Sequence, residues 1–267
     1  MDSTTRHRIA AGAAALALLT GGGLVAGCGS SGDASGDGAS TAATSTAAAN
    51  GIETKSAQEI LDAAKTAALA ATSVTVKGAI SQGGENIALD LQVGQEASQG
   101  SITAKGVTIQ MKMLAGKIYF KVSGDDFATL LGQDDSPEVA DAISSLLGDK
   151  WLVAPEGASA NGLEAFGELG QKDSLLNSVL TASGTVAVDG TGDVNGQPVV
   201  LLTSSGSAGT LAIATTGEPY PVQVKSSDGS DGGQIDFTDW NAPIEVTAPT
   251  DVLDIGALAQ LGGASGG

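Results

Sequence analysis

The sequence is poor in the side chains on which most enzyme chemistry depends. It has one cysteine, Cys28, and one histidine, His7, and both arginines, Arg6 and Arg8, lie in the first eight residues. Beyond Cys28 the chain cannot form a Ser-His-Asp or Cys-His arrangement, nor a zinc or copper site of His and Cys ligands. We therefore expect a protein that is not an enzyme, with no catalytic residues, no metal and no cofactor.

Positive charge is also scarce. The chain has 12 Lys and Arg residues against 30 Asp and Glu residues, a formal net charge of −18. Nucleic-acid binding depends on Lys and Arg side chains that neutralise phosphates, so this composition excludes a nucleic-acid partner. The doublets Asp125-Asp126 and Asp134-Asp135 offer carboxylates of the kind that glycosidases use in pairs. We interpret them instead as solvated acids of loops and helix starts.

Aromatic residues make up 3% of the chain, against 42% for all hydrophobic residues. The core must then consist mainly of Val, Ile, Leu and Ala. An aliphatic interior suits acyl chains, although an Ala- and Gly-rich composition of the whole genome would give the same pattern.

The first 28 residues have the order of an export signal. Arg6-His7-Arg8 precedes an apolar stretch from Ile9 to Leu19, and small residues lead into Val25-Ala26-Gly27-Cys28. The apolar stretch is too short and too rich in glycine to cross about 30 Å of hydrocarbon as a helix. Small residues before a cysteine resemble the bacterial lipobox, in which the cysteine receives diacylglycerol and a peptidase cuts on its N-terminal side.

We therefore predict a signal peptide over residues 1–27 and a lipidated mature N-terminus, with palmitate among its acyl chains, at Cys28. Two or more chains give stable attachment, because each buried CH₂ contributes about 0.8 kcal/mol. The protein is expected at the cell membrane, lipid-anchored on the extracytoplasmic face. In the alternative, an ordinary secretory signal, Cys28 would be incidental; its being the only cysteine favours the lipobox.

Composition divides the remainder into three parts. Residues 28–52 are expected to form the lipidated N-terminus and a flexible spacer of small and polar residues. Residues 53–255 have the length of a single domain. Residues 256–267 form a Gly/Ala-rich tail.

Hydrophobic periodicity predicts an α+β domain. A capping box at Ser56-Ala57-Gln58-Glu59 predicts a helix over 56–72. A period of 2 from residue 73 predicts an antiparallel meander with one wet and one apolar face. Helical spacing returns over 124–182 around a short strand at 151–153, and strands resume over 186–237. Asn195-Gly196 and 231–233 supply turn residues, and 228–232 fits a hairpin turn better than a calcium loop.

The pattern resembles the actinobacterial LppX/LprA/LprF/LprG lipoproteins, distantly similar to the LolA/LolB sorting factors. The resemblance rests on the lipobox, the 115–120 segment Ala-Gly-Lys-Ile-Tyr-Phe, Lys150-Trp151 and, most specifically, residues 237–246 from Phe237 to Val246. It implies a strongly curved antiparallel β-sheet, a half barrel, with helices packed on its concave face. An aliphatic cavity between them would carry acyl chains of lipids or glycolipids.

The resulting hypothesis is a membrane-anchored extracytoplasmic lipoprotein that binds and carries acylated lipids or glycolipids. Its cavity would be lined by Val76, Leu89, Leu91, Ile109, Met111, Ile118, Phe120, Leu130, Leu146, Val179, Leu201 and Ile213. The same residues would form a filled core if there were no cavity. The alternative function is a non-catalytic surface sensor or accessory module that binds a protein partner.

Two further motifs have two interpretations each. Lys77, Lys112 and Lys121 fall on the polar face of the first meander, where they would contact anionic headgroups or only solvent. The 239–243 segment around Trp240 would contact ligand or membrane at a rim, or form a strand-ending turn that packs on the sheet.

Overall fold

The computed structural model describes residues 48–82, 84–126, 141, 144–153, 169–228 and 231–254. The chain divides into two compact units, residues 1–45 and 46–267, and the fold below is that of the second unit. The predicted signal peptide, Cys28, most of the spacer, Leu130 and the tail lie outside the described residues. Among the helices of the described ranges, none is long and apolar enough to cross a membrane.

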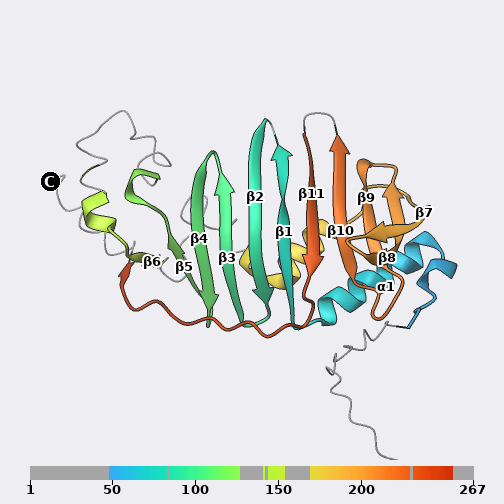
Figure 1. Cartoon of the computed structure of the whole chain (residues 1–267), viewed down its shortest axis with the longest axis horizontal. Coiled ribbons are helices and arrows are strands. Elements are labelled where there is room, and N and C mark those ends of the chain that lie inside the picture. The colour runs from blue at the N-terminus through green and yellow to red at the C-terminus, as the bar shows by residue number, and fades with distance from the viewer. Residues whose placement is uncertain are drawn as a thin grey trace, which may run out of the picture. The chain divides into compact units, whose positions relative to one another are not determined.

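Twelve strands form one open sheet in the order β12-β6-β5-β4-β3-β2-β1-β11-β10-β9-β8-β7 (Figure 1). Their bounds are β1 Ser73–Gln82, β2 Glu85–Gly94, β3 Ala97–Ala104, β4 Val107–Leu114, β5 Lys117–Lys121, β6 Trp151–Val153, β7 Val186–Val194, β8 Gln197–Ser204, β9 Ser207–Ala214, β10 Pro221–Asp228, β11 Asp231–Thr238 and β12 Val252–Asp254. Neighbouring strands pair antiparallel except β12 and β6, which are parallel. The sheet is therefore mixed at this edge, a correction to the antiparallel sheet that was predicted.

Strand β1 joins the two meanders into one sheet. It pairs with β2 from Ser73↔Gly94 to Gln82↔Glu85, and with β11 from Thr75↔Thr238 to Ile80↔Gly233. The first meander, β1–β5, and the second, β7–β11, are thus the two halves of the sheet that the periodicity predicts.

Two details of the sheet differ from the sequence prediction. The alternation does not predict β3, because Ile102 is the only large apolar residue in its sequence ASQGSITA. Residues 231–233, predicted as turn residues, belong to β11, and Asp231 pairs directly with Asp228. The Asn195-Gly196 turn is confirmed, with φ angles of 54° and 80° that a tight hairpin requires.

Glycines let the backbones of neighbouring strands approach closely. A Cβ atom added to Gly78 would lie 2.0 Å from Gln234 O, and one added to Gly100 would lie 2.1 Å from Asp90 O. Glycines at such positions mark tight bends in sheets, and register shifts in β7, β8 and β10 add further twist. These features fit the curved sheet that was predicted.

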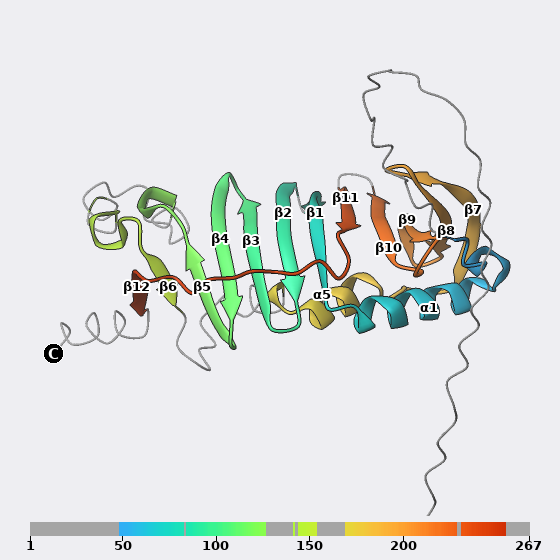
Figure 2. The same ribbon diagram turned by 60° about the horizontal axis from the view of Figure 1, so that its bottom comes forward.

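Helix α1, Ala57–Ala70, begins at the predicted capping box. Ser56 Oγ accepts a hydrogen bond from Glu59 N, and Glu59 Oε2 accepts one from Ser56 N at 3.0 Å. The hydrogen bonds from Ser56 hold the pKa of Glu59 below its usual value. Helix α5, Lys172–Val179, runs on the same side of the sheet as α1 (Figure 2). The side of the sheet that these helices contact is called the inner face below.

The end of the predicted spacer packs on the sheet. Ala49 forms an isolated bridge with Thr216, and Asn50 N donates to Thr215 O at 2.9 Å, just beyond β9. Ile52, the first residue of the short helix η1 (Ile52–Thr54), is 3% exposed. The chain therefore reaches the folded unit by residue 49 and enters α1 from there.

On the outer face, the β7–β8 hairpin folds over β9–β11. Asp236 Oδ1 accepts hydrogen bonds from Gln223 Nε2 at 2.7 Å and from Asn195 Nδ2 at 3.1 Å, and its Oδ2 accepts one from Gln234 Nε2. Burial raises the pKa of Asp236, but these three amide hydrogen bonds together bring that pKa below its usual value. Beneath the hairpin lies a small apolar cluster of Val199, Ala212, Ala214 and Val222.

We predict that Gly78→Ala destabilises the domain by about 2–4 kcal/mol, because the new methyl group must displace the backbone of β11. Urea unfolding followed by circular dichroism would measure the effect. The matched control is Gly192→Ala in β7, where an added Cβ would only touch Leu201 Cδ1 at 3.8 Å. Equal stability of the two variants would contradict the close approach of the β1 and β11 backbones at Gly78.

Candidate functional site

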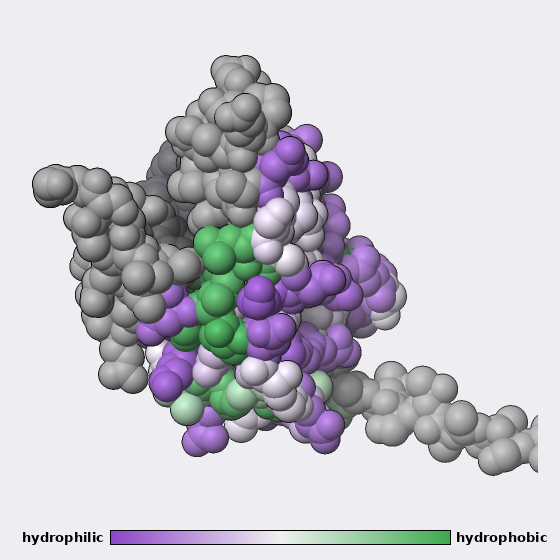
Figure 3. Space-filling view, turned by 90° about the vertical axis from the view of Figure 1, so that its left-hand side faces the viewer, coloured by the Kyte–Doolittle hydropathy of each residue, from purple (hydrophilic) through white to green (hydrophobic). Residues whose placement is uncertain are grey.

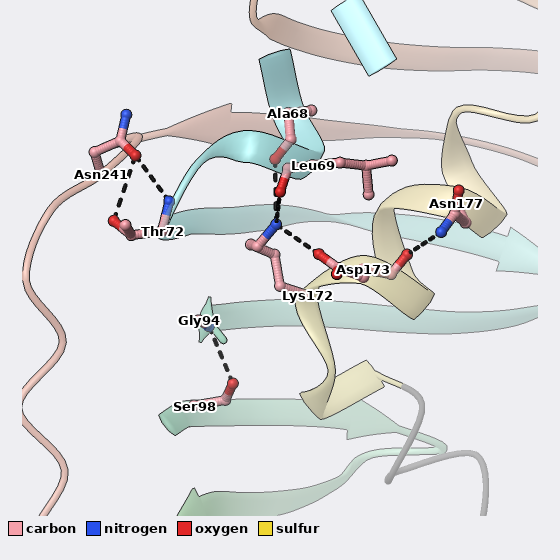
Figure 4. Close-up of polar contacts among 9 residues, drawn as sticks. All are labelled: Ala68, Leu69, Thr72, Gly94, Ser98, Lys172, Asp173, Asn177 and Asn241. Atoms are coloured by element: carbon pink, nitrogen blue, oxygen red, sulfur yellow. Dashed lines mark hydrogen bonds and ion pairs between the residues drawn. The ribbon is translucent and has the colours of Figure 1, made fainter. Parts of the chain in front are cut away.

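A buried lysine fixes α5 to the end of α1. Lys172 is 1% exposed, and its Nζ donates to Leu69 O at 2.9 Å, to Ala68 O at 3.3 Å and to Asp173 Oδ1 at 2.6 Å (Figure 4). The last carbonyl groups of a helix have no partner within it. Lys172 supplies that partner, so the ammonium group of the first residue of α5 caps the free carbonyl groups at the end of α1.

A second polar contact holds the chain immediately before α5. Ser98 Oγ, fully buried in β3, donates to Gly170 O at 2.6 Å and accepts from Gly94 N at 3.2 Å (Figure 4 shows the latter). A Cβ atom on Gly170 would lie 3.4 Å from Met113 Sδ. The start of α5 is therefore fixed against β2–β4 as well as against α1.

An apolar cavity lies where α1, the end of α5 and strands β7–β10 meet. Its volume is about 250 Å³. Aliphatic side chains dominate its lining: Leu61, Val179, Leu180, Ala182, Val186, Leu202, Leu211 and Val224. Its polar side chains are those of Thr181, Thr203, Ser204, Ser207, Thr210, Lys225 and Ser226. The exposure of Thr181 and Ser207 places solvent at that side. This arrangement can hold an apolar group with a polar end at the mouth.

Of the twelve predicted lining residues, Val179 lines this cavity. Most of the others are on the inner face but are covered. Val76, Leu89, Leu91 and Met111 belong to the core cluster beneath Leu175, Leu176 and Leu180. Ile118 packs against that cluster and also lines a separate pocket beside Gln171. Here α5 itself fills the space in which the sequence predicts a ligand.

The remaining predicted residues lie in other parts of the sheet. Ile213 packs with Ile60 in a cluster beneath α1, and Ile109 and Phe120 pack in a third cluster at β4–β6. Leu201 lies on the outer face against Val199 and Ala212, so it cannot share a cavity with its neighbour Leu202. That placement corrects the prediction for Leu201.

Leu146 is 49% exposed and lies outside the lining of this cavity. Leu146 comes shortly before β6 in the chain. In β6 and its neighbour β12, Val153, Val252 and Leu253 are partly exposed too. Figure 3 looks onto this end and shows an apolar strip between polar side chains.

Sequence reasoning missed most of the residues that line this cavity. Leu61 was available as an apolar position of the predicted helix, and Leu202, Leu211 and Val224 lie in predicted strands. Their alternation assigns them to the inner face, but not to the part of that face which α5 leaves open.

The three lysines of the first meander have partners in the folded unit. Lys77 Nζ lies 3.2 Å from Asp90 Oδ2, and Lys121 Nζ lies 3.2 Å from Asp149 Oδ1. Lys112 Nζ donates to Thr247 O at 3.2 Å. The partners of Lys77 and Lys121 are carboxylates, whereas the partner of Lys112 is a neutral carbonyl oxygen.

Of the two interpretations of the 239–243 segment, the structure supports the strand-ending turn. Trp240 stacks on Tyr220 with ring centroids 4.6 Å apart, and its Nε1 donates to Pro221 O. Asn241 Oδ1 accepts from Thr72 N at 2.8 Å, and Asn241 Nδ2 donates to the Tyr220 hydroxyl (Figure 4 shows the contact with Thr72). This segment is a turn that packs on the sheet and ties the α1–β1 corner to β10.

Within the described ranges, no three acidic side chains gather closely enough to hold a metal ion. Asp236, the carboxylate with three amide partners, is occupied by them on the outer face.

No protein-family model and no curated protein matches the chain. Solved structures are similar to it: LprF from Mycobacterium bovis, 15% identical with a TM-score of 0.49, matches over 72% of this chain and 96% of that one. The Mycobacterium tuberculosis lipoprotein LppX, 18% identical with a TM-score of 0.43, matches over 71% and 99%. An uncharacterized conserved protein from Thermus thermophilus follows at 10% identity, a TM-score of 0.33, and 74% and 98% coverage. The first two belong to the group that the sequence resembles.

We predict that Lys172→Met lowers the free energy of unfolding by about 2–4 kcal/mol, because Ala68 O and Leu69 O are left without their donor in a buried place. Methionine keeps much of the side-chain volume, so the loss reports the polar contact. Chemical unfolding would measure it, with the exposed Lys117→Met in β5 as control. A variant as stable as the control would show that the cap of α1 is dispensable.

Proposed function

We propose that this protein is a membrane-anchored extracytoplasmic lipoprotein that binds an acyl chain of a lipid or glycolipid in the cavity between α1, α5 and β7–β10. The aliphatic lining of that cavity is the observation that carries the proposal. Removing apolar surface from water contributes roughly 25 cal/mol per Å², and binding of this kind needs no catalytic group.

The size of the cavity bears on how a ligand would enter. At about 250 Å³ it is slightly smaller than the roughly 300–1,000 Å³ of typical ligand pockets. A longer chain would therefore extend past Val179 and Leu180 and move the end of α5 away from β10. Lys172 holds the other end of α5, so that helix would pivot about its first residue.

The membrane anchor is the second part of the proposal. Lipid on Cys28 would keep the half barrel beside the membrane, from which it would take acylated lipid or to which it would deliver it. The lipobox residues Val25-Ala26-Gly27 support this anchor. The chain joins the folded unit at Ala49, which bridges Thr216 just beyond the C-terminal end of β9, whereas the cavity lies at the N-terminal end of that strand.

For acyl binding, we predict that the wild-type protein takes up a fluorescent long-chain fatty acid and co-purifies with lipid in native mass spectrometry. Leu211→Trp, which adds volume to the cavity wall, should weaken uptake by at least about tenfold, or about 1.4 kcal/mol. Leu146→Trp is the matched control, because Leu146 lies outside the lining. No lipid and no uptake in the wild type would refute the proposal, and crosslinking to one protein partner would then support the sensor alternative.

For the anchor, we predict that cells grown with labelled palmitate incorporate the label into this protein and that Cys28→Ser abolishes incorporation. The reason is that the thiol is the side chain that forms the thioether. Label that persists in Cys28→Ser would contradict lipidation at this position.

A further inference from the structure

A polar trough crosses the outer face of the sheet, on the side opposite α5. It has a volume of about 540 Å³ and extends from Asp239, which follows β11, across β1–β4 to Trp151 in β6. Figure 1 looks onto this face, with α5 behind the strands. The trough is separate from the acyl cavity, because the sheet lies between them.

The side chains of the trough form two rows that cross the strands. The strand register gives the first row as Thr75, Gln92, Gln99 and Lys112, and the second as Lys77, Asp90, Ser101 and Gln110. Neighbouring members of a row are one strand spacing apart, about 4.8 Å. Such rows present hydrogen-bonding groups at regular intervals to an extended ligand.

Neutral polar groups dominate these rows. Six of the thirteen lining residues are Thr, Ser or Gln, whose hydroxyl and amide groups both donate and accept hydrogen bonds. Gln99 Nε2 already donates to Gln92 Oε1 at 2.9 Å, which orients the two amides toward each other. A ligand that fits must itself both donate and accept at short intervals.

The charges of the trough cancel. Its two lysines, Lys77 and Lys112, are matched by two acids, Asp90 and Asp239. Lys77 is paired with Asp90 at 3.2 Å. A chain with a net charge of −18 also repels anions at long range. The trough therefore suits an uncharged ligand.

Trp151 supplies an aromatic surface at one end. Its side chain is half-buried, and the Lys112 ammonium group lies 5.0 Å from the ring centroid. Trp151 N donates to Asp251 O, and Lys112 donates to Thr247 O, so the 242–251 segment along the strand ends holds both residues. Indole rings pack well on the C–H faces of sugar rings because they combine an apolar body with a polar edge.

From these features we infer that the trough is a binding site for a neutral oligosaccharide, which lies across β1–β4 with one sugar ring against Trp151. Hydroxyl groups of the sugar would exchange hydrogen bonds with Gln92, Gln99 and Gln110. The site does not depend on the acyl cavity, and it would let the protein hold a glycan while a lipid occupies the other face.

The test uses the full-length lipoprotein in a detergent without a sugar headgroup, titrated with neutral tetrasaccharides of mannose, glucose, galactose and N-acetylglucosamine. We expect at least one tetrasaccharide to bind and to change the tryptophan emission of the wild type. In the Trp151→Phe variant the same ligand should change the emission much less. Trp151→Ala should weaken binding, followed by calorimetry, by at least about tenfold.

Gln99→Ala provides a second variant that leaves the core intact, since Gln99 lies on the outer face. It should weaken binding by at least about threefold, as expected for a lost hydrogen bond, whereas Gln197→Ala in β8 should not. Tetraglycine is the control ligand. The inference is overturned if no tetrasaccharide binds, if tetraglycine binds as tightly, or if Gln99→Ala and Gln197→Ala behave alike.

Discussion

The hydrogen bonds of the Lys172 ammonium group determine where α5 lies, and the inner face depends on that position. They join residues about a hundred positions apart, Lys172 with Ala68 and Leu69. Once α5 starts there, Leu175 and Leu176 are buried against β1–β4. The helix then ends at the wall of the cavity, beside Val179 and Leu180. One buried amino group thus separates the part of the inner face that is core from the part that is open.

The α1–β1 corner carries a second constraint, which comes from the other end of the domain. Asn241 contacts Thr72 and Tyr220, and Trp240 stacks on Tyr220 and lies beside the ring of Phe237. The pairing of β1 with β11 brings these segments together, since Asn241 follows β11 within three residues. Helix α1, both meanders and the 242–251 segment therefore meet at one corner, so a change in β1–β11 pairing would disturb all of them.

Local patterns in the sequence predict α1, α5 and most strands, because a capping box and an alternation are complete within a few residues. Strand β3 has one large apolar side chain and is defined by its neighbours, and the parallel β12–β6 pair depends on a distant segment. The residues that line the cavity could not be predicted in the same way. Alternation assigns Val76 and Leu91 to the inner face correctly but cannot show that α5 covers them. In the run Val199-Val200-Leu201-Leu202 every position is apolar, so a period of 2 cannot assign Leu201 to a face.

The two faces of the sheet differ because different parts of the chain cover them. On the inner face, α1 and α5 bury aliphatic side chains of β1–β4 and of β8–β9, and they leave the cavity open between α1, the end of α5 and β7–β10. On the outer face, the β7–β8 hairpin closes over β9–β11, held by Asn195 and Asp236 above a small apolar cluster. No described helix or hairpin covers the outer face of β1–β4, and there the outward positions are hydroxyls, amides and paired charges. The apolar outward positions thus lie beneath the β7–β8 hairpin, together with the hydrogen-bonded Asp236, and the uncovered outward positions of β1–β4 are polar. The trough therefore lies at the end of the sheet that the hairpin leaves uncovered.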